Sequence, residues 1–367
     1  MSPIPYVDLP AQHAAIEDEI LEAVRRVLRH GWFILGPEVQ ALEAALAARI
    51  GVRHVVGVGN GTDALALALR AHGVGPGHEV ITVSHSFFAT ASAIEMVGAV
   101  PVFVDIHPDT LLMDPALLEG ALTSRTRAVM PVHLMGHPCD MDAIGAFCDA
   151  HGLALIEDAA QSIDARWQGR AVGGFGTGCF SMHPLKNLAA CGDAGFVSTD
   201  DDAIAGWVRQ ARNIGIRGRD HCDFVSGNSR LDAMHAAILG VKLEHLDAWT
   251  VRRREHAAAY RIALEGHLRL PPAEPEHGQA VYHAFVVRHP QRDRLMAALG
   301  DQGIATKVHY PIPIHRQPAF ARHATGPLPH TERAVAEILS LPVFPELCDG
   351  DRERVILALV SACQGLR

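Results

Sequence analysis

Short apolar runs recur through the first half of the chain at intervals of about 20 to 27 residues. Within each run the apolar residues are continuous and do not alternate with polar ones, which is typical of strands that are covered on both faces. Each run is also short enough to be a single strand. We therefore predict five strands, which are His54–Val58, Glu79–Val83, Val100–Val104, Arg127–Val132 and Leu153–Ile156.

Alanine- and leucine-rich stretches with helical periodicity lie between these runs. Strands that alternate with helices form βαβ units around a mostly parallel sheet. Asp114 and Pro115 mark a further helix start, because Asp favours the N-cap and Pro the first helical position. The predicted helices are Thr62–Ala71, Thr90–Val97 and Met141–Ala150.

A glycine-rich segment follows at residues 171–200, where four glycines precede a strand-like run at Cys179–Met182. Such a segment lets the backbone approach a ligand closely. Residues 229–266 then have the pattern of one long helix. We predict that residues 1–250, with an N-terminal arm, form a large α/β domain.

The remainder of the chain is predicted to be a smaller α+β domain, residues 251–367. Leu270–Pro275 is rich in proline and is a plausible linker into it. The pattern predicts strands over Val281–Arg288 and Thr306–Tyr310, a loop over Pro311–Pro318, and helices over Arg292–Leu299, Glu332–Leu339 and Arg352–Ala362.

The composition excludes several classes of protein. The chain has 367 residues, of which 49% are hydrophobic and 20% charged, so it is not disordered. Its formal net charge of −9 argues against non-specific nucleic-acid binding. We expect no secretory signal, because Met1–Pro10 has no basic region followed by an apolar run. No apolar run is long enough to cross a membrane, and the seven cysteines form no C-x-x-C pair. We expect a soluble cytoplasmic protein without a metal site.

Lysine is rare, since the 32 basic residues comprise 29 arginines and three lysines. Lys186 lies in the glycine-rich segment, where an exposed, solubilising role is least expected. Lysine can lose its proton and attack a carbonyl, which arginine cannot. Lys242 is predicted to lie on a solvated helix face and Lys307 at a strand edge.

Residues 59–63, Gly-Asn-Gly-Thr-Asp, lie between a predicted strand and a predicted helix. A helix N-terminus offers free N–H groups and the positive end of the helix dipole, which suits a phosphate. The alternative is a tight turn in which Thr62 or Asp63 caps the helix. The segment has neither the Walker pattern nor G-x-G-x-x-G.

Two more segments follow predicted strands, at the edge where parallel sheets bind ligands. Glu157 and Asp158 are adjacent carboxylates, and Asp158 could keep a ring nitrogen protonated. The alternatives are a solvated loop or helix cap and a magnesium site. Phe87 and Phe88 could stack on a flat cofactor or pack in the core.

In this order, these segments resemble the DegT/StrS sugar aminotransferases, which are fold type I enzymes that use pyridoxal 5'-phosphate (PLP). The resemblance covers nearly the whole chain. Further blocks that look like the family are Pro5–Leu9, Gly36–Val39, Gly61–Leu65, Asp140–Asp142, Gly192–Gly195, Asn228–Asp232 and His309–Pro311.

The resemblance implies a role for each matching residue around the cofactor ring. Lys186 would form a Schiff base with the cofactor aldehyde, and Asp158 would pair with the pyridine nitrogen. Gln161 would bond the phenolic oxygen, and Phe87 would stack on the ring face.

The phosphate would be held by Gly61, Thr62 and Ser181, and by Asn228 of a neighbouring subunit. The resemblance therefore implies a homodimer with shared active sites.

The implied reaction is transfer of an amino group from an amino acid, usually L-glutamate, to a keto sugar that we expect to be nucleotide-linked. We place His183, Tyr310 and His315 in the acceptor pocket. The lysine segment, with His183 where many relatives have an aromatic residue, leaves open a non-nucleotide sugar such as a keto-octulosonate or a cyclitol. A sugar dehydratase, which has histidine in place of Lys186, and a non-catalytic regulator are further alternatives.

The basic run Arg252–Arg254 is expected to be a solvated helix turn.

Overall fold

The computed structural model describes residues 2–271, 274, 278–324 and 326–366. A seven-stranded sheet forms its centre, with the strand order β1-β9-β8-β5-β4-β2-β3. The strands are β1 (His54–Val58), β2 (Glu79–Val83), β3 (Val100–Val104), β4 (Thr126–Val129), β5 (Ala154–Asp158), β8 (Thr177–Ser181) and β9 (Gly195–Thr199).

The sheet is mostly parallel, as the sequence predicts. β2, β3, β4, β5 and β8 pair in parallel, whereas β9 runs antiparallel to both of its neighbours, β8 and β1. The sequence analysis did not assign β9, although all five of its residues are buried. Its run is interrupted by glycine and by hydroxyl side chains, so the apolar pattern there is weak.

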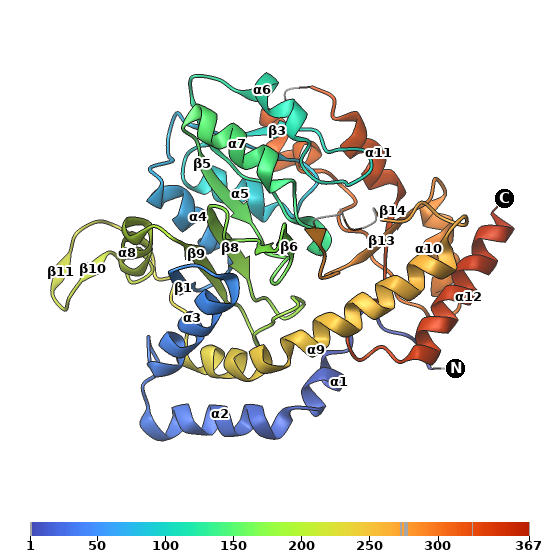
Figure 1. The fold of residues 1–367 in the computed structure, drawn as a ribbon, viewed down its shortest axis with the longest axis horizontal. Helices are drawn as coiled ribbons and strands as arrows, with labels where there is room; N and C mark the ends of the chain where they lie inside the picture. The colour runs from blue at the N-terminus through green and yellow to red at the C-terminus, as the bar shows by residue number, and fades with distance from the viewer. Residues whose placement is uncertain (1, 272–273, 275–277, 325, 367) are drawn as a thin grey trace.

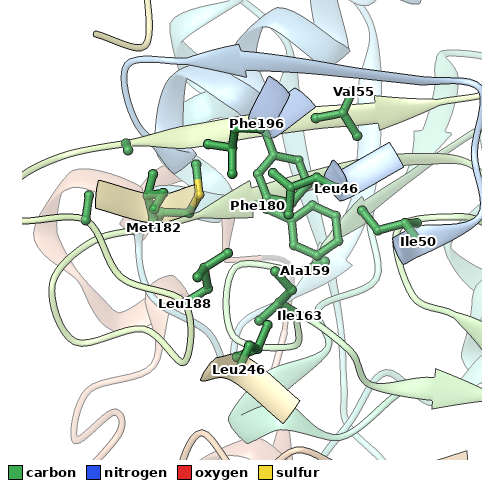
Figure 2. Close-up of a cluster of buried hydrophobic side chains, with 14 of the residues drawn as sticks. Leu46, Ile50, Val55, Ala159, Ile163, Phe180, Met182, Leu188, Phe196 and Leu246 are labelled. Carbon is green, nitrogen blue, oxygen red and sulfur yellow. The ribbon is translucent and has the colours of Figure 1, made fainter. Parts of the chain in front are cut away.

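The two faces of the sheet are packed against different helices. Phe180 and Phe196 stack at a centroid distance of 4.3 Å on the face toward α3 (Pro37–Ile50), within the apolar cluster that Figure 2 shows. Their neighbours in the same strands, Cys179 and Val197, point to the other face and join the cluster around α4 (Gly61–Ala71). Successive side chains of a strand face opposite ways, so each strand is covered on both sides.

Helices at the N-terminus complete this part of the fold. α1 (Leu9–Ala14), α2 (Glu17–His30) and α3 precede the first strand, and the sequence analysis did not predict them. α2 and α3 both pack against the long helix α9 (Ala233–Leu264), as Figure 1 shows. Since α2 buries only a narrow stripe through Ala23 and Val27, its sequence is largely polar and easily missed.

α9 is the long helix expected over residues 229–266, and its 32 residues span about 48 Å at 1.5 Å per residue. It contacts α2 and α3 near one end and α12 (Asp349–Gly365) near the other. The proposed domain boundary at residue 250 falls inside this helix, so the division into 1–250 and 251–367 stays a proposal.

The C-terminal part contains the antiparallel pair β13 (Phe285–Arg288) and β14 (Ile338–Leu341), with α10 (Arg292–Gly300), α11 (Pro329–Glu337) and α12. One prediction was wrong here, since Thr306–Tyr310 forms only an isolated bridge, between Lys307 and Ser340. The helix predicted near Glu332–Leu339 is confirmed as α11, but it ends at Glu337, where β14 begins. The proposed linker Leu270–Pro275 lies partly outside the described residues.

The structure also tests three smaller predictions, on the cap at Asp114, on membrane-spanning helices and on the cysteines. Asp114 caps the short turn Pro115–Leu117 by accepting a hydrogen bond from the Ala116 amide at 3.0 Å. No helix within these ranges is long and apolar enough to span a membrane. Within the described residues no cysteine forms a disulfide bond.

Candidate active site

A cavity of about 670 Å³ opens where the carboxyl ends of the strands meet, which is where ligands bind in parallel α/β sheets. Segments that follow β1, β2, β5 and β8 line it. The sequence analysis gave eleven residues a role in binding the cofactor or the acceptor sugar. Nine of them line this cavity, which are Gly61, Thr62, Phe87, Asp158, Gln161, Ser181, His183, Lys186 and Tyr310.

Lys186 enters the cavity from the bend after β8, where its amide donates to the His183 carbonyl at 2.8 Å. Burial lowers the pKa of the amine from 10.5 to about 8, and the nearby charge of Asp158 opposes this shift. Roughly a tenth of such an amine is neutral at pH 7, compared with well under a thousandth for an ordinary lysine. The cavity therefore holds an amine that is prepared to act as a nucleophile or base.

Asp158 is the carboxylate that faces this lysine, at the end of β5. It is 5% exposed, and burial raises the pKa of its carboxyl group. Its Oδ2 accepts from Thr90 Oγ1 at 2.7 Å, and its Oδ1 from the Ala160 amide at 3.2 Å. Because Thr90 donates to Asp158, the Ser86 hydroxyl at 2.7 Å must donate to Thr90. This chain of hydroxyls orients the carboxylate, and the sequence analysis missed Thr90.

Glu157, its neighbour in the sequence, has a different role. It is fully buried and accepts from the amides of Gly173, Phe175 and Gly176 at 2.7 to 2.9 Å, and its Oε2 lies 3.1 Å from His133 Nε2. It therefore anchors the glycine-rich segment and does not face the cavity. No cluster of three metal-binding side chains occurs in the described part of the chain, so nothing supports the magnesium alternative.

The N-terminus of α4 forms another wall of the cavity. Asn60 caps it by accepting from the Asp63 amide at 2.9 Å, which leaves the first amides of the helix, on Gly61 and Thr62, without partners inside the helix. A Cβ on Gly61 would lie 2.7 Å from the Ser181 Cβ, so only glycine lets the helix start this close to the end of β8. Free amides beside a hydroxyl suit a phosphate.

An aromatic and amide group forms a third wall. The rings of Phe87 and Tyr310 lie 5.5 Å apart, and Phe87 is 43% exposed. Gln161 accepts from the Met135 amide through Oε1 at 2.6 Å and donates to the Tyr310 hydroxyl through Nε2 at 3.0 Å. These hydrogen bonds hold Gln161 and Tyr310 in place at the cavity wall.

Two of the eleven residues lie elsewhere. His315 is 2% exposed, lies between Ser84 Oγ (2.6 Å) and Glu332 (3.2 Å), and does not line this cavity, so its assignment to the acceptor sugar stays a prediction. Asn228 is exposed and also does not line the cavity. Its neighbour Ser229 donates to Asp63 at 2.6 Å, so Asn228 lies beside the start of α4.

Two expectations about basic residues were wrong. Lys242 is fully buried, with Nζ 2.8 Å from His13 Nε2, because the N-terminal helix α1 covers this side of α9. Arg253 is 5% exposed, lines the cavity and donates to the Val343 carbonyl at 2.6 Å. The helix α9 is enclosed on more sides than its sequence suggests, so charged residues on it are not all solvated.

His283, His309 and Tyr6 also line the cavity, and residue-level reasoning had not singled them out as ligands. Burial, together with nearby positive charge from Lys186, lowers the pKa of both histidines, that of His309 to about 4. Both are therefore neutral at pH 7. His309 lies in one of the segments that resemble the family, and this resemblance was the signal in the sequence that could have identified it as a cavity residue.

The chain is similar to known proteins over nearly its whole length. The model of the DegT/DnrJ/EryC1/StrS aminotransferase family matches residues 14–360. A pleiotropic regulatory protein of Geobacillus stearothermophilus is 47% identical over 96% of either chain. The dTDP-3-amino-3,4,6-trideoxy-alpha-D-glucose transaminase of Streptomyces venezuelae is 45% identical over 97% of this chain and 95% of its own. The crystal structure of S. venezuelae DesV in complex with a ketimine intermediate superposes with a TM-score of 0.97, at 44% identity and 99% coverage of both chains.

The cavity fits the cofactor of this family. It presents an amine of lowered pKa, a single oriented carboxylate and a helix N-terminus that only a glycine could bring so close to β8. These groups match the aldehyde, the ring nitrogen and the phosphate of PLP. The chain therefore belongs to the DegT/DnrJ/EryC1/StrS aminotransferase family and is a PLP-dependent sugar aminotransferase.

Proposed function

We propose that this chain transfers the amino group of L-glutamate to a nucleotide-linked keto sugar in the biosynthesis of an amino sugar. The observation that carries the proposal is the convergence of Lys186, Asp158 and the start of α4 on one cavity. The name of the S. venezuelae relative, a dTDP-sugar transaminase, supports a nucleotide-linked acceptor. Because nucleotide-linked sugars are made in the cytoplasm, we propose that this enzyme is cytoplasmic.

PLP, when bound, supplies an electron sink conjugated to the carbon that exchanges its amino group. Lys186 Nζ would hold the cofactor aldehyde covalently. Asp158 would hold the proton on the ring nitrogen, a role that its fixed hydrogen bonds to Thr90 and Ala160 support. Phe87 would cover the ring face, and Gln161 Nε2 would donate to the phenolic oxygen.

Lys186 would also move the proton that the reaction requires. When the amino group of the donor replaces it, the released amine can take the proton from the donor α-carbon, because burial keeps its pKa near 8. The same amine would return that proton, and the donor would leave as its keto acid, with water supplying the carbonyl oxygen. The keto sugar then receives the amino group by the same steps in reverse.

The phosphate would lie against the amides of Gly61 and Thr62 and the Ser181 hydroxyl. Asn228 would reach the phosphate site of a neighbouring subunit, so that each site is completed in a homodimer. Its exposure supports this role. Large apolar side chains that are exposed in the single chain, including Trp32 (59%), Phe33 (45%) and Phe88 (49%), support burial by a second copy.

His183 and Tyr310 are the side chains that we assign to the acceptor sugar. His183 is exposed at the mouth of the cavity and Tyr310 is held by Gln161, so both can meet a ligand that enters from solvent. Lys186 itself disfavours the dehydratase alternative, which has histidine at this position. A purely regulatory role would not require an amine of lowered pKa beside an oriented carboxylate.

Separate half-reactions test the proposal. Enzyme loaded with PLP and mixed with L-glutamate alone should release about one 2-oxoglutarate per subunit, since no acceptor completes the cycle. Addition of a keto sugar should then give an amino sugar, identified by mass spectrometry. Absence of 2-oxoglutarate would contradict the glutamate donor, and amination of free but not nucleotide-linked keto sugars would contradict the acceptor class.

A further inference from the structure

Arg253 is a buried cation at the cavity, and among the described residues it forms no ion pair within 4.0 Å. Other buried arginines are paired, since Arg212 lies 2.5 Å from Glu43 and Arg288 lies 2.8 Å from Glu337. Arg253 is 5% exposed like them, yet within the described ranges it forms no ion pair with any carboxylate. A buried charge is costly unless an opposite charge compensates it.

The guanidinium of Arg253 is held in place from one side only. Its Nη1 donates to the Val343 carbonyl at 2.6 Å and to the Tyr282 carbonyl at 3.4 Å. Its Nε is buried and has no hydrogen-bond partner among the described residues. Backbone carbonyls therefore fix the orientation of the fork while part of its donor capacity stays unused.

The position of Arg253 relates it to the reacting lysine. His283 lies within electrostatic reach of both Arg253 and Lys186, and all three line the cavity. His283 and His309 are neutral, so Arg253 is the side chain of this wall that carries a fixed positive charge. Glu346 also lies within electrostatic reach of Arg253, but it accepts from Gln12 at 3.2 Å and burial raises its pKa.

We propose that Arg253 binds a carboxylate group of the amino-acid donor. In an amino acid the α-carboxylate and the amino group are attached to the same carbon, so a residue that binds this carboxylate has to lie near Lys186. The planar guanidinium fork matches a carboxylate in shape and charge. The inference rests on the proposed function, because it is that reaction which brings an amino acid into the cavity.

Glutarate, a dicarboxylate without an amino group, tests this site without any turnover. Its dissociation constant is measured by titration calorimetry on PLP-loaded enzyme for the wild type, Arg253→Gln and Arg253→Lys. Arg252→Gln is the matched control, since it removes the same charge from the neighbouring residue, which pairs with Glu255 and Asp349 at the surface. We expect binding to weaken about 10- to 100-fold in Arg253→Gln, less in Arg253→Lys, and not in the control.

The half-reactions then show which substrate carries the carboxylate. The KM for glutamate should rise in Arg253→Gln, while amination of the keto sugar by enzyme already carrying the amino group should be unchanged. Unaltered glutarate binding in a folded Arg253→Gln or Arg253→Lys enzyme, or a defect confined to the keto-sugar half-reaction, overturns the inference. If Arg253→Gln does not fold, Arg253→Lys decides. Wild-type enzyme that binds glutarate but does not convert glutamate contradicts the donor in the proposed function and leaves the Arg253 site supported.

Discussion

The three lysines of this chain lie in three different environments. Lys186 lines the cavity, Lys242 is buried against His13, and Lys307 is exposed beside Ser340. Sequence reasoning selected Lys186 because of its glycine-rich surroundings, and it expected Lys242 on a solvated helix face and Lys307 at a strand edge. That expectation failed for Lys242, because the helix that covers it is more than 200 residues away in the sequence.

Replacing Lys186 by arginine should abolish covalent retention of the cofactor and transamination, because a guanidinium stays protonated and cannot attack an aldehyde. Borohydride reduction followed by peptide mass spectrometry should place the cofactor on residue 186 in the wild type and nowhere in Lys186→Arg. Lys307→Arg is the matched control and should keep both properties. Cofactor found on Lys242 or Lys307 would refute the assignment of Lys186.

The same residue should make the stability of the cofactor-free protein depend on pH. The pKa of Lys186 is about 8 in the folded chain, whereas its ordinary value of 10.5 applies in the unfolded chain. Between these two pH values the unfolded chain therefore binds more protons than the folded chain. The free energy of unfolding should therefore rise from pH 8 to 10.5, by on the order of 3 kcal/mol from this group. Denaturant melts of wild type and Lys186→Met should differ in this slope, and equal slopes would contradict the lowered pKa.

At the scale of elements, the segments that follow the strands create the site. The sequence located β1, β2, β5 and β8 within a few residues, and with them the start of α4, Asp158 and Lys186. It assigned Asp158 to the ring nitrogen but gave no role to Glu157, because only the tertiary structure shows that the adjacent side chain anchors the glycine-rich segment. It also missed Arg253 and His283, which are brought together by contacts between α9 and the C-terminal part.

Gly61→Ala tests the close approach of α4 to β8. Its new Cβ would lie 2.7 Å from the Ser181 Cβ, so the helix start must shift away from the phosphate site. We expect PLP affinity, measured by dialysis and absorbance, to fall about tenfold or more, as for the loss of a charge-assisted hydrogen bond. Gly145→Ala in α7 (Met141–His151) is the control, since its Cβ meets nothing and the helix should gain about 0.5–1 kcal/mol. Wild-type affinity in Gly61→Ala would contradict the phosphate assignment.

At the scale of the whole molecule, the proposal that two subunits share each active site can be tested by complementation. Lys186→Ala and Asn228→Ala should each lose activity alone, if Asn228 acts across the dimer interface. A heterodimer of the two variants contains one site with both defects and one intact site. After subunit exchange in an equal mixture, roughly a quarter of wild-type activity should return. No recovery despite heterodimers detected by native mass spectrometry would place Asn228 in its own subunit's site or outside any site.

The sequence by itself determined the fold class, the family and six of the seven strands of the central sheet, and it selected Lys186 among three lysines, because these depend on local periodicity and on short ordered segments. The tertiary structure decided which polar side chains are in the cavity and which are structural. His315 lies in a loop that the sequence assigned to the acceptor, yet it is enclosed by Ser84 and Glu332. Arg253 lies on a helix that was assigned to solvent, yet it lines the cavity beside Val343. Burial and charge pairing depend on contacts between residues far apart in the chain, and no local pattern contains them.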